Sequence, residues 1–233
     1  MPKLEQDRNQ MPTLPKAKAL PGLHEAVALE VQQHTPKPAC ILDIAAGNGA
    51  LSKRLLDLGY AVVANDLDRS GWALPDLPLA QIDLNRPFAP SFADQGIRTI
   101  AAVEIIEHLE NPRAFLRECR EIVPPGGHLL VTTPNVTSAF SRAMFFRLGT
   151  MPFFHPREYH LSGHITLLPH WLLAEHTRAA GWKIVRTCFA GQNEPTSPVQ
   201  RIGASSARWI GRFSQEAEQQ SGCVLFVLQR DGS

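Results

Sequence analysis

The sequence lacks an excess of charge of either sign, and it lacks a long hydrophobic run. Its 233 residues include 23 basic and 22 acidic side chains, a formal net charge of +1. Such a balance provides no overall field to collect nucleic acid or an anionic membrane, so it argues against a nucleic-acid substrate. No apolar stretch approaches the ~20 residues that span a bilayer, and the N-terminus has no signal-peptide core. We therefore predict a cytoplasmic protein with no membrane span.

Paired cysteines are also missing. Cys40, Cys119, Cys188 and Cys223 lie far apart in the sequence and form no C-x-x-C pair. Nothing therefore indicates a zinc knuckle or a redox motif. Each cysteine falls inside or beside an apolar run, so we interpret all four as small buried hydrophobic residues in a reducing compartment.

Strand and helix signals alternate through most of the chain. The apolar runs that predict strands lie at 39–44, 61–64, 79–84, 97–103, 128–133, 182–189 and 223–229. Helical periodicity is found at 22–34, around Leu51 to Leu58, at 111–122 and at 169–180. This alternation predicts a doubly wound α/β fold, with a mostly parallel sheet covered by helices on both faces. Ligands of such sheets bind at the carboxyl ends of the strands.

The remaining segments interrupt this pattern. Residues 1–20 are rich in proline and have no apolar periodicity, so we expect a disordered tail before a single domain at 21–233. The insert 136–168 is rich in Phe, Met, Arg and His, and we interpret it as a substrate lid. The second insert, 190–222, has an amphipathic part. A helix packed on the domain is its commoner explanation, with a membrane-surface or partner helix as the alternative.

A glycine-rich loop ends the first expected strand. It reads Asp43-Ile44-Ala45-Ala46-Gly47-Asn48-Gly49, and an acid, Asp66, closes the next strand. An open α/β sheet holds an adenosine-bearing cofactor in this way. A nicotinamide enzyme would have a third glycine where this chain has Ser52, and the spacing of Asp66 fits either cofactor class. The acid at Asp43, four residues before Gly47, separates the two classes.

The loop resembles motif I of the class I S-adenosylmethionine-dependent methyltransferases, D-x-G-x-G-x-G, with Ala45 in place of the first glycine. The resemblance continues at Asp66, at Asp83-Leu84, at 104–109 and at 125–135. It is strongest to the ubiquinone-biosynthesis O-methyltransferase-like group. It implies S-adenosylmethionine as cofactor and a Rossmann-like, mostly parallel seven-stranded sheet with an antiparallel strand near the C-terminus. The cofactor-binding residues that it implies are Asp43, Ala45, Gly47, Asn48, Asp66, Leu67, Asp83, Leu84 and Glu104.

The chemistry of that cofactor suggests a role for each residue. Asp66 can accept both ribose hydroxyls, Gly47 lets the backbone approach closely, and Asp43 can orient the loop amides or the α-ammonium. Asp83 would meet the adenine amino group, with Leu84 near the ring. The alternative for Asp83 is an ordinary solvated turn carboxylate.

Glu104, Glu107 and His108 are spaced i, i+3 and i+4, so a helix after the fourth strand would place them on one face, toward the active site. Glu107 or His108 could then act as a general base. The small-RNA 3′-terminal 2′-O-methyltransferases have a similar E-x-x-E-H segment that binds a divalent ion together with a downstream histidine. That histidine would be His164 here, in preference to His155 or His160. The four side chains suit magnesium, manganese or zinc, and a segment that only lines the pocket is the alternative.

We therefore expect an S-adenosylmethionine-dependent methyltransferase that acts on a hydroxyl of a small molecule. The catalytic residues would be Glu107, His108 and His164, and the metal ligands would be these three with Glu104. Two rivals stay open: metal-assisted 2′-O-methylation of an RNA 3′ end, and a non-catalytic cofactor-binding protein of the same fold. The sequence does not indicate the oligomeric state.

Overall fold

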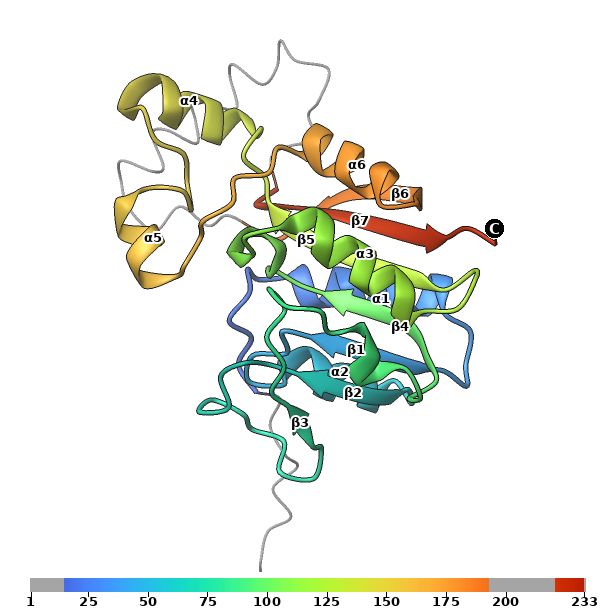
Figure 1. Ribbon diagram of the computed structural model, residues 1–233. Helices are drawn as coiled ribbons and strands as arrows, with labels where there is room; N and C mark the ends of the chain where they lie inside the picture. Colours follow the sequence, from blue (N-terminus) through green and yellow to red (C-terminus); the bar gives the residue numbers. More distant parts are fainter. Residues whose placement is uncertain (1–14, 193–220, 233) are drawn as a thin grey trace, which may run out of the picture.

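The computed structural model describes residues 15–192 and 221–232, which form one seven-stranded sheet between two layers of helices (Figure 1). The strand order is β3-β2-β1-β4-β5-β7-β6. Strand β7 runs antiparallel to β5 and β6, and the other pairs are parallel. The predicted doubly wound sheet, with one antiparallel strand near the C-terminus, is confirmed.

The strands are β1 Cys40–Ile44, β2 Ala61–Asn65, β3 Leu79–Ala80, β4 Ile97–Ala102, β5 His128–Pro134, β6 Trp182–Ala190 and β7 Cys223–Arg230. The helices are α1 Leu23–His34, α2 Ala50–Asp57, α3 Pro112–Ile122, α4 Ala139–Leu148, α5 Pro156–Leu161 and α6 His170–Ala179, with 3₁₀ turns η1 Ala89–Phe92 and η2 Ile106–His108. Among the described residues, no helix is long and apolar enough to cross a membrane.

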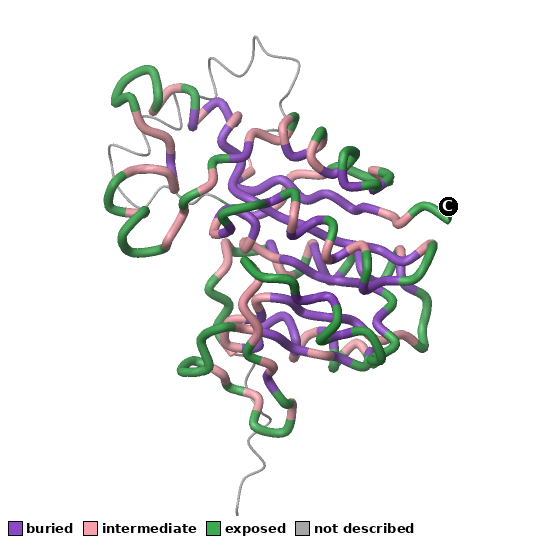
Figure 2. Tube along the Cα trace, in the orientation of Figure 1, coloured by how far each residue is buried: buried purple, intermediate pink, exposed green. Residues whose placement is uncertain are grey.

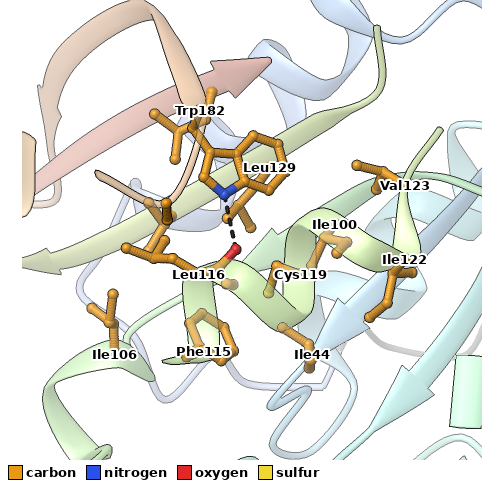
Figure 3. Packing of buried hydrophobic residues seen from close by; sticks show 14 of the residues in the cluster. Ile44, Ile100, Ile106, Phe115, Leu116, Cys119, Ile122, Val123, Leu129 and Trp182 are labelled. Carbon is orange, nitrogen blue, oxygen red and sulfur yellow. Dashed lines mark hydrogen bonds between the residues drawn. The ribbon is translucent and has the colours of Figure 1, made fainter. Parts of the chain in front are cut away.

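Each face of the sheet has its own hydrophobic core, and successive strand residues contribute to opposite cores. Ile41 packs with α1 and α2, whereas its neighbour Leu42 packs with α3 and α6. The central strands are therefore buried along most of their length (Figure 2). In the core under α3 and α6, Trp182 Nε1 donates a hydrogen bond to the Leu116 carbonyl oxygen at 2.9 Å (Figure 3). This bond satisfies the one polar atom of the indole.

The third strand is shorter than predicted. We expected it over 79–84, whereas β3 contains only Leu79 and Ala80. The side chain of Asn65 replaces the backbone ladder beyond that point. Its Nδ2 donates to the Ile82 carbonyl oxygen at 3.3 Å, and its Oδ1 accepts from the Ile82 amide at 3.0 Å. The asparagine amide thus satisfies the backbone groups that a longer β3 would have paired.

The predicted lid insert, 136–168, contains α4 and α5, which extend beyond the carboxyl ends of the parallel strands (Figure 1). Its two ends are held together, because Thr137 Oγ1 lies 2.8 Å from His170 Nδ1. The second predicted insert, 190–222, lies mostly outside the described residues.

Part of the predicted tail also falls within the structure. Residues 15–20 form no helix or strand, yet they contact the domain. Asn48 Nδ2 donates to the Lys16 carbonyl oxygen at 2.7 Å, and Leu20 lies beside Gly191. The rest of that segment, 1–14, lies outside the described residues.

The turn before β5 has no room for a side chain at Gly127. A Cβ there would lie 2.8 Å from the Pro124 carbonyl oxygen and 2.9 Å from that of Arg98, both backbone atoms. We expect Gly127→Ala to lower the free energy of unfolding by about 2 kcal/mol, measured by urea denaturation. Gly71→Ala is the matched control, since its Cβ would make ordinary contacts with two side chains, at 3.6 Å from Lys18 Nζ and 4.0 Å from Asn48 Cβ. Equal losses in the two variants would contradict the steric explanation.

Candidate active site

The expected cofactor residues begin at the carboxyl ends of β1 and β2, which are neighbours in the sheet. The Gly47 amide donates to Asp66 Oδ2 at 2.7 Å, so the loop after β1 is fastened to the acid after β2. Asp66 Oδ1 accepts from the Asp68 amide at 2.9 Å. These two bonds fix the carboxylate of Asp66 at the edge where the sequence predicts a ribose.

Asp43 is buried at the end of β1. Ser52 Oγ donates to its Oδ2 at 2.5 Å, which ties β1 to α2. Burial raises the pKa of Asp43 to about 6, Asp66 adds to the rise, and the Ser52 hydrogen bonds oppose it. In the sequence, Ser52 was notable only because it stands where a nicotinamide enzyme has its third glycine. In the structure it is the hydrogen-bond donor to Asp43. Asp43 is therefore bonded to the first turn of α2, the helix that follows the loop.

The glycine loop has left-handed backbone at three positions. Gly47 has φ 58°, and a Cβ added there would meet nothing within 4 Å, so the space over the loop is open to a ligand. At Gly49, with φ 87°, a Cβ would lie 2.9 Å from Leu74. Ala45 has φ 64°, a conformation that favours glycine, where the family motif has its first glycine. The loop fits a cofactor that approaches its backbone, with strain at Ala45.

The other expected contacts have more varied surroundings. Leu67 is 65% exposed, so its side chain is available to an adenine ring, whereas Leu84 packs against the core under α3. Asn48 Oδ1 accepts from the amide two residues on, at 3.3 Å. Asp83 also accepts from the amide two residues on, and it pairs with Arg86 at 3.3 Å. These bonds are typical of the solvated turn carboxylate that was the alternative for Asp83.

The helix expected over Glu104, Glu107 and His108 is wrong. Only a short 3₁₀ turn, η2, forms there, and Glu104 precedes it with a left-handed backbone, φ 52°. The three side chains therefore do not share one helical face. The Glu104 amide donates to Thr132 Oγ1 at 3.0 Å, and its carboxylate accepts from Cys223 Sγ at 3.0 Å. Sequence reasoning missed this cysteine contact, because the two residues are 119 positions apart.

The structure does bring Glu107, His108 and His164 together. One potential ligand atom from each lies within 4.8 Å of the other two, and the two imidazole rings are 4.7 Å apart, edge to face. Backbone bonds join the lid to η2, because the amides of Ile165 and Thr166 both donate to the Glu107 carbonyl oxygen, at 3.0 and 2.9 Å. Glu104, the fourth expected ligand, lies outside this three-residue cluster.

Glu107 is fully buried and only partly satisfied. Its Oε2 accepts from Thr133 Oγ1 at 3.1 Å, while its Oε1 has no hydrogen-bond partner among the described residues. Burial, together with the charge of Glu104, raises the pKa of Glu107 well above its usual value. A buried carboxyl group with an unused oxygen is costly unless a ligand completes its bonding.

Both histidines of the cluster favour the neutral form. Burial lowers the pKa of His108 and of His164. His164 Nδ1 lies 2.9 Å from the Phe153 carbonyl oxygen, which can only accept, so Nδ1 carries the proton and Nε2 keeps the lone pair. Two neutral imidazoles beside an incompletely bonded acid can accept a proton from a substrate or bind a cation.

A family model described as "Methyltransferase domain" matches residues 16–187 of the chain. The chain belongs to this methyltransferase family. Members of the family use S-adenosylmethionine, so the open glycine loop and the acid at Asp66 form the edge at which this cofactor is implied to bind.

Curated relatives share part of their length with this methyltransferase. "Ubiquinone biosynthesis O-methyltransferase" of Caulobacter vibrioides is 33% identical over 104 residues, 42% of this chain and 41% of that protein. The protein of the same name from Cereibacter sphaeroides strain ATCC 17029 is 33% identical over 101 residues, 41% of each. The chain thus matches less than half the length of these relatives.

Solved structures support the fold over nearly the whole chain. A SAM-dependent methyltransferase from Archaeoglobus fulgidus superposes with a TM-score of 0.62 at 15% identity, covering 89% of this chain and 94% of that one. The [4+2]-cyclase SpnF superposes with a TM-score of 0.63 at 13% identity, covering 94% and 90%. The second structure shows that this fold also occurs in a protein named for another reaction.

Proposed function

We propose that this methyltransferase transfers the methyl group of S-adenosylmethionine to a hydroxyl oxygen of a small molecule. The cluster of Glu107, His108 and His164 carries the proposal, because methylation of a hydroxyl releases a proton that an unprotonated imidazole can accept. The curated O-methyltransferases that match 41–42% of the chain support the same chemistry. A net charge of +1 supports a small acceptor rather than a nucleic acid.

The residues at the strand ends would bind the cofactor in a single orientation. Asp66 would accept hydrogen bonds from the ribose hydroxyls, and Leu67 would cover the adenine ring. The open backbone at Gly47 would lie under the methionine part, with Glu104 facing its ammonium group. When bound, the cofactor supplies an electrophilic methyl group. Holding the acceptor in line with that group can contribute about 7–11 kcal/mol to the rate.

The histidines would remove the acceptor's proton. In neutral His164 the lone pair is on Nε2, since Nδ1 donates to the Phe153 carbonyl oxygen. His108 lies edge to face with the same ring, so either imidazole can receive the proton while the other stays neutral. The lid formed by α4 and α5 ends three residues before His164, so it would lie beside the base. There it would exclude water and select the acceptor.

A divalent ion at the same cluster is the second proposal. The three donor atoms lie within 4.8 Å of one another, and within the described part of the chain Glu107 Oε1 has no hydrogen-bond partner that a cation would displace. One carboxylate and two imidazoles suit zinc or manganese better than magnesium, which prefers oxygen ligands. A bound ion would lower the pKa of an acceptor hydroxyl. Metal analysis and assays in chelator test the ion. Full activity in chelator would reject it and leave the histidines as bases.

Calorimetry tests the cofactor assignment. We expect binding of S-adenosylmethionine and S-adenosylhomocysteine, and none of nicotinamide dinucleotides. Asp66→Asn should weaken binding by about 2 kcal/mol, roughly thirtyfold, because it removes the charge that accepts the ribose hydroxyls. Asp68→Asn is the matched control, since that exposed carboxylate bonds only to Ser70. If neither adenosyl compound binds the wild-type protein, the proposed function is wrong.

Methyl transfer to a panel of phenols, alcohols, thiols and amines then tests the acceptor class. Labelled S-adenosylmethionine should methylate hydroxyl compounds. A panel arm with single-stranded RNA bearing a free 3′ end separates the rival acceptor. Transfer to RNA alone would replace the small molecule, and binding without any transfer would support the non-catalytic reading.

A further inference from the structure

Cys223 contacts the candidate site from a distant part of the chain. It is the first residue of β7, it is fully buried, and its Sγ lies 3.0 Å from Glu104 Oε1. The backbone around it is fixed by the sheet: the Asn135 amide donates to the Gly222 carbonyl oxygen at 2.7 Å, and the Gly222 amide donates to that of Gly191 at 2.9 Å. The position of the thiol is therefore set by β5 and β6.

Glu104 is held at both ends. Its left-handed backbone is fixed by the bond from its amide to Thr132 Oγ1 at 3.0 Å, and its carboxylate meets the thiol of Cys223. A strained residue persists only where its surroundings enforce it, and such residues concentrate at ligand sites. A thiol is a weak donor, so it orients this carboxylate without satisfying it fully.

A second acid near Glu104 also has incomplete hydrogen bonding. Glu107 Oε1, three residues further along the chain, is buried without a hydrogen-bond partner among the described residues. Two acids therefore lie at the end of β4, one held by a weak donor and one with an unused oxygen. That arrangement favours a cationic ligand group at this point.

We propose that Cys223 is a positioning residue, whose thiol holds the Glu104 carboxylate toward the ammonium group of the bound cofactor. This rests on the proposed function, since the ammonium belongs to S-adenosylmethionine. From the sequence we interpreted Cys223 as a small buried hydrophobic residue, and it is buried. The contact of its thiol with Glu104 adds a proposed role in cofactor binding.

Substitutions at Cys223 separate hydrogen bonding from packing. We expect Cys223→Ala to weaken S-adenosylhomocysteine binding about fivefold in calorimetry, and Cys223→Ser to bind within about twofold of wild type because its hydroxyl still donates. Cys223→Val fills the volume without a donor, so it should lose affinity as the alanine variant does. Cys119→Ala is the control: that cysteine, on the buried face of α3, is equally buried, and its loss should leave binding unchanged.

A double-variant cycle tests whether the thiol acts through Glu104. Glu104→Gln should weaken binding by itself, and adding Cys223→Ala to it should cause no further loss. Wild-type affinity in Cys223→Val, or fully additive losses in the cycle, would overturn the inference. Failure of the wild-type protein to bind either adenosyl compound would instead overturn the proposed function, so the two failures are distinguishable.

Discussion

His164→Ala should lower kcat at least about 100-fold, while S-adenosylhomocysteine binds with unchanged affinity. The variant removes one of the two imidazoles of the Glu107, His108 and His164 cluster, and it leaves the glycine loop and Asp66 intact. A base that acts only on the acceptor contributes to the chemical step and not to cofactor binding. Single-turnover methyl transfer, together with calorimetry on the same preparation, measures both quantities.

The lid supplies a matched control. His160→Ala removes the same side chain from α5, where it is exposed and meets the Tyr159 ring edge to face, so its rate should stay near wild type. If His108 and His164 act as one unit, the double variant should be little slower than the slower single variant. Equal rates for His164→Ala and His160→Ala would show that the acceptor does not react at this cluster.

Local sequence was sufficient for the features that depend on neighbouring residues. The helix predicted at 111–122 is an example: the Asn111 side chain accepts from the Ala114 amide at 3.0 Å, and Pro112 occupies the first helical position. The glycine loop is another, because the carboxyl ends of adjacent parallel strands necessarily bring it close to Asp66. The 2.7 Å bond from Gly47 to that acid follows from this topology.

The features that the sequence did not predict depend on contacts between distant segments. The spacing of Glu104, Glu107 and His108 would have put them on one face if the chain formed a helix after β4, but the Glu104 amide bonds to Thr132 on β5 and the backbone of Glu104 is left-handed. Likewise, β3 ends early because Asn65, on another strand, bonds the backbone of Ile82. A pattern read along one segment does not show which partner a polar side chain will meet across the sheet.

Asp43→Asn should raise the free energy of unfolding at pH 7 by about 3 kcal/mol and should change its pH dependence. Burial holds the pKa of Asp43 at about 6, above its ordinary value of 3.8. The folded state therefore keeps a proton that the unfolded state releases, and wild-type stability from this group falls as pH rises from about 4 to 6. The asparagine cannot titrate, so the difference in stability between variant and wild type should grow over that interval. Urea denaturation at half-unit pH steps measures it, and a difference that does not change with pH would contradict the assignment.

His128, at the opposite end of the sheet, should show the reverse sign. Burial, with the charges of His34 and Arg98, lowers the pKa of His128 to about 4 from 6.5. Its contribution is present above pH 6.5 and is lost as pH falls toward 4, so His128→Gln should gain stability relative to wild type as the solution is acidified. In the wild-type protein the effects of Asp43 and His128 on the pH dependence of stability have opposite signs. Each variant removes one effect and so exposes the pH dependence due to the other residue. Because His128 lies away from the glycine loop, only Asp43→Asn should also alter cofactor affinity. An acid that destabilises the fold at neutral pH, beside an open glycine loop, is typical of a position kept for binding.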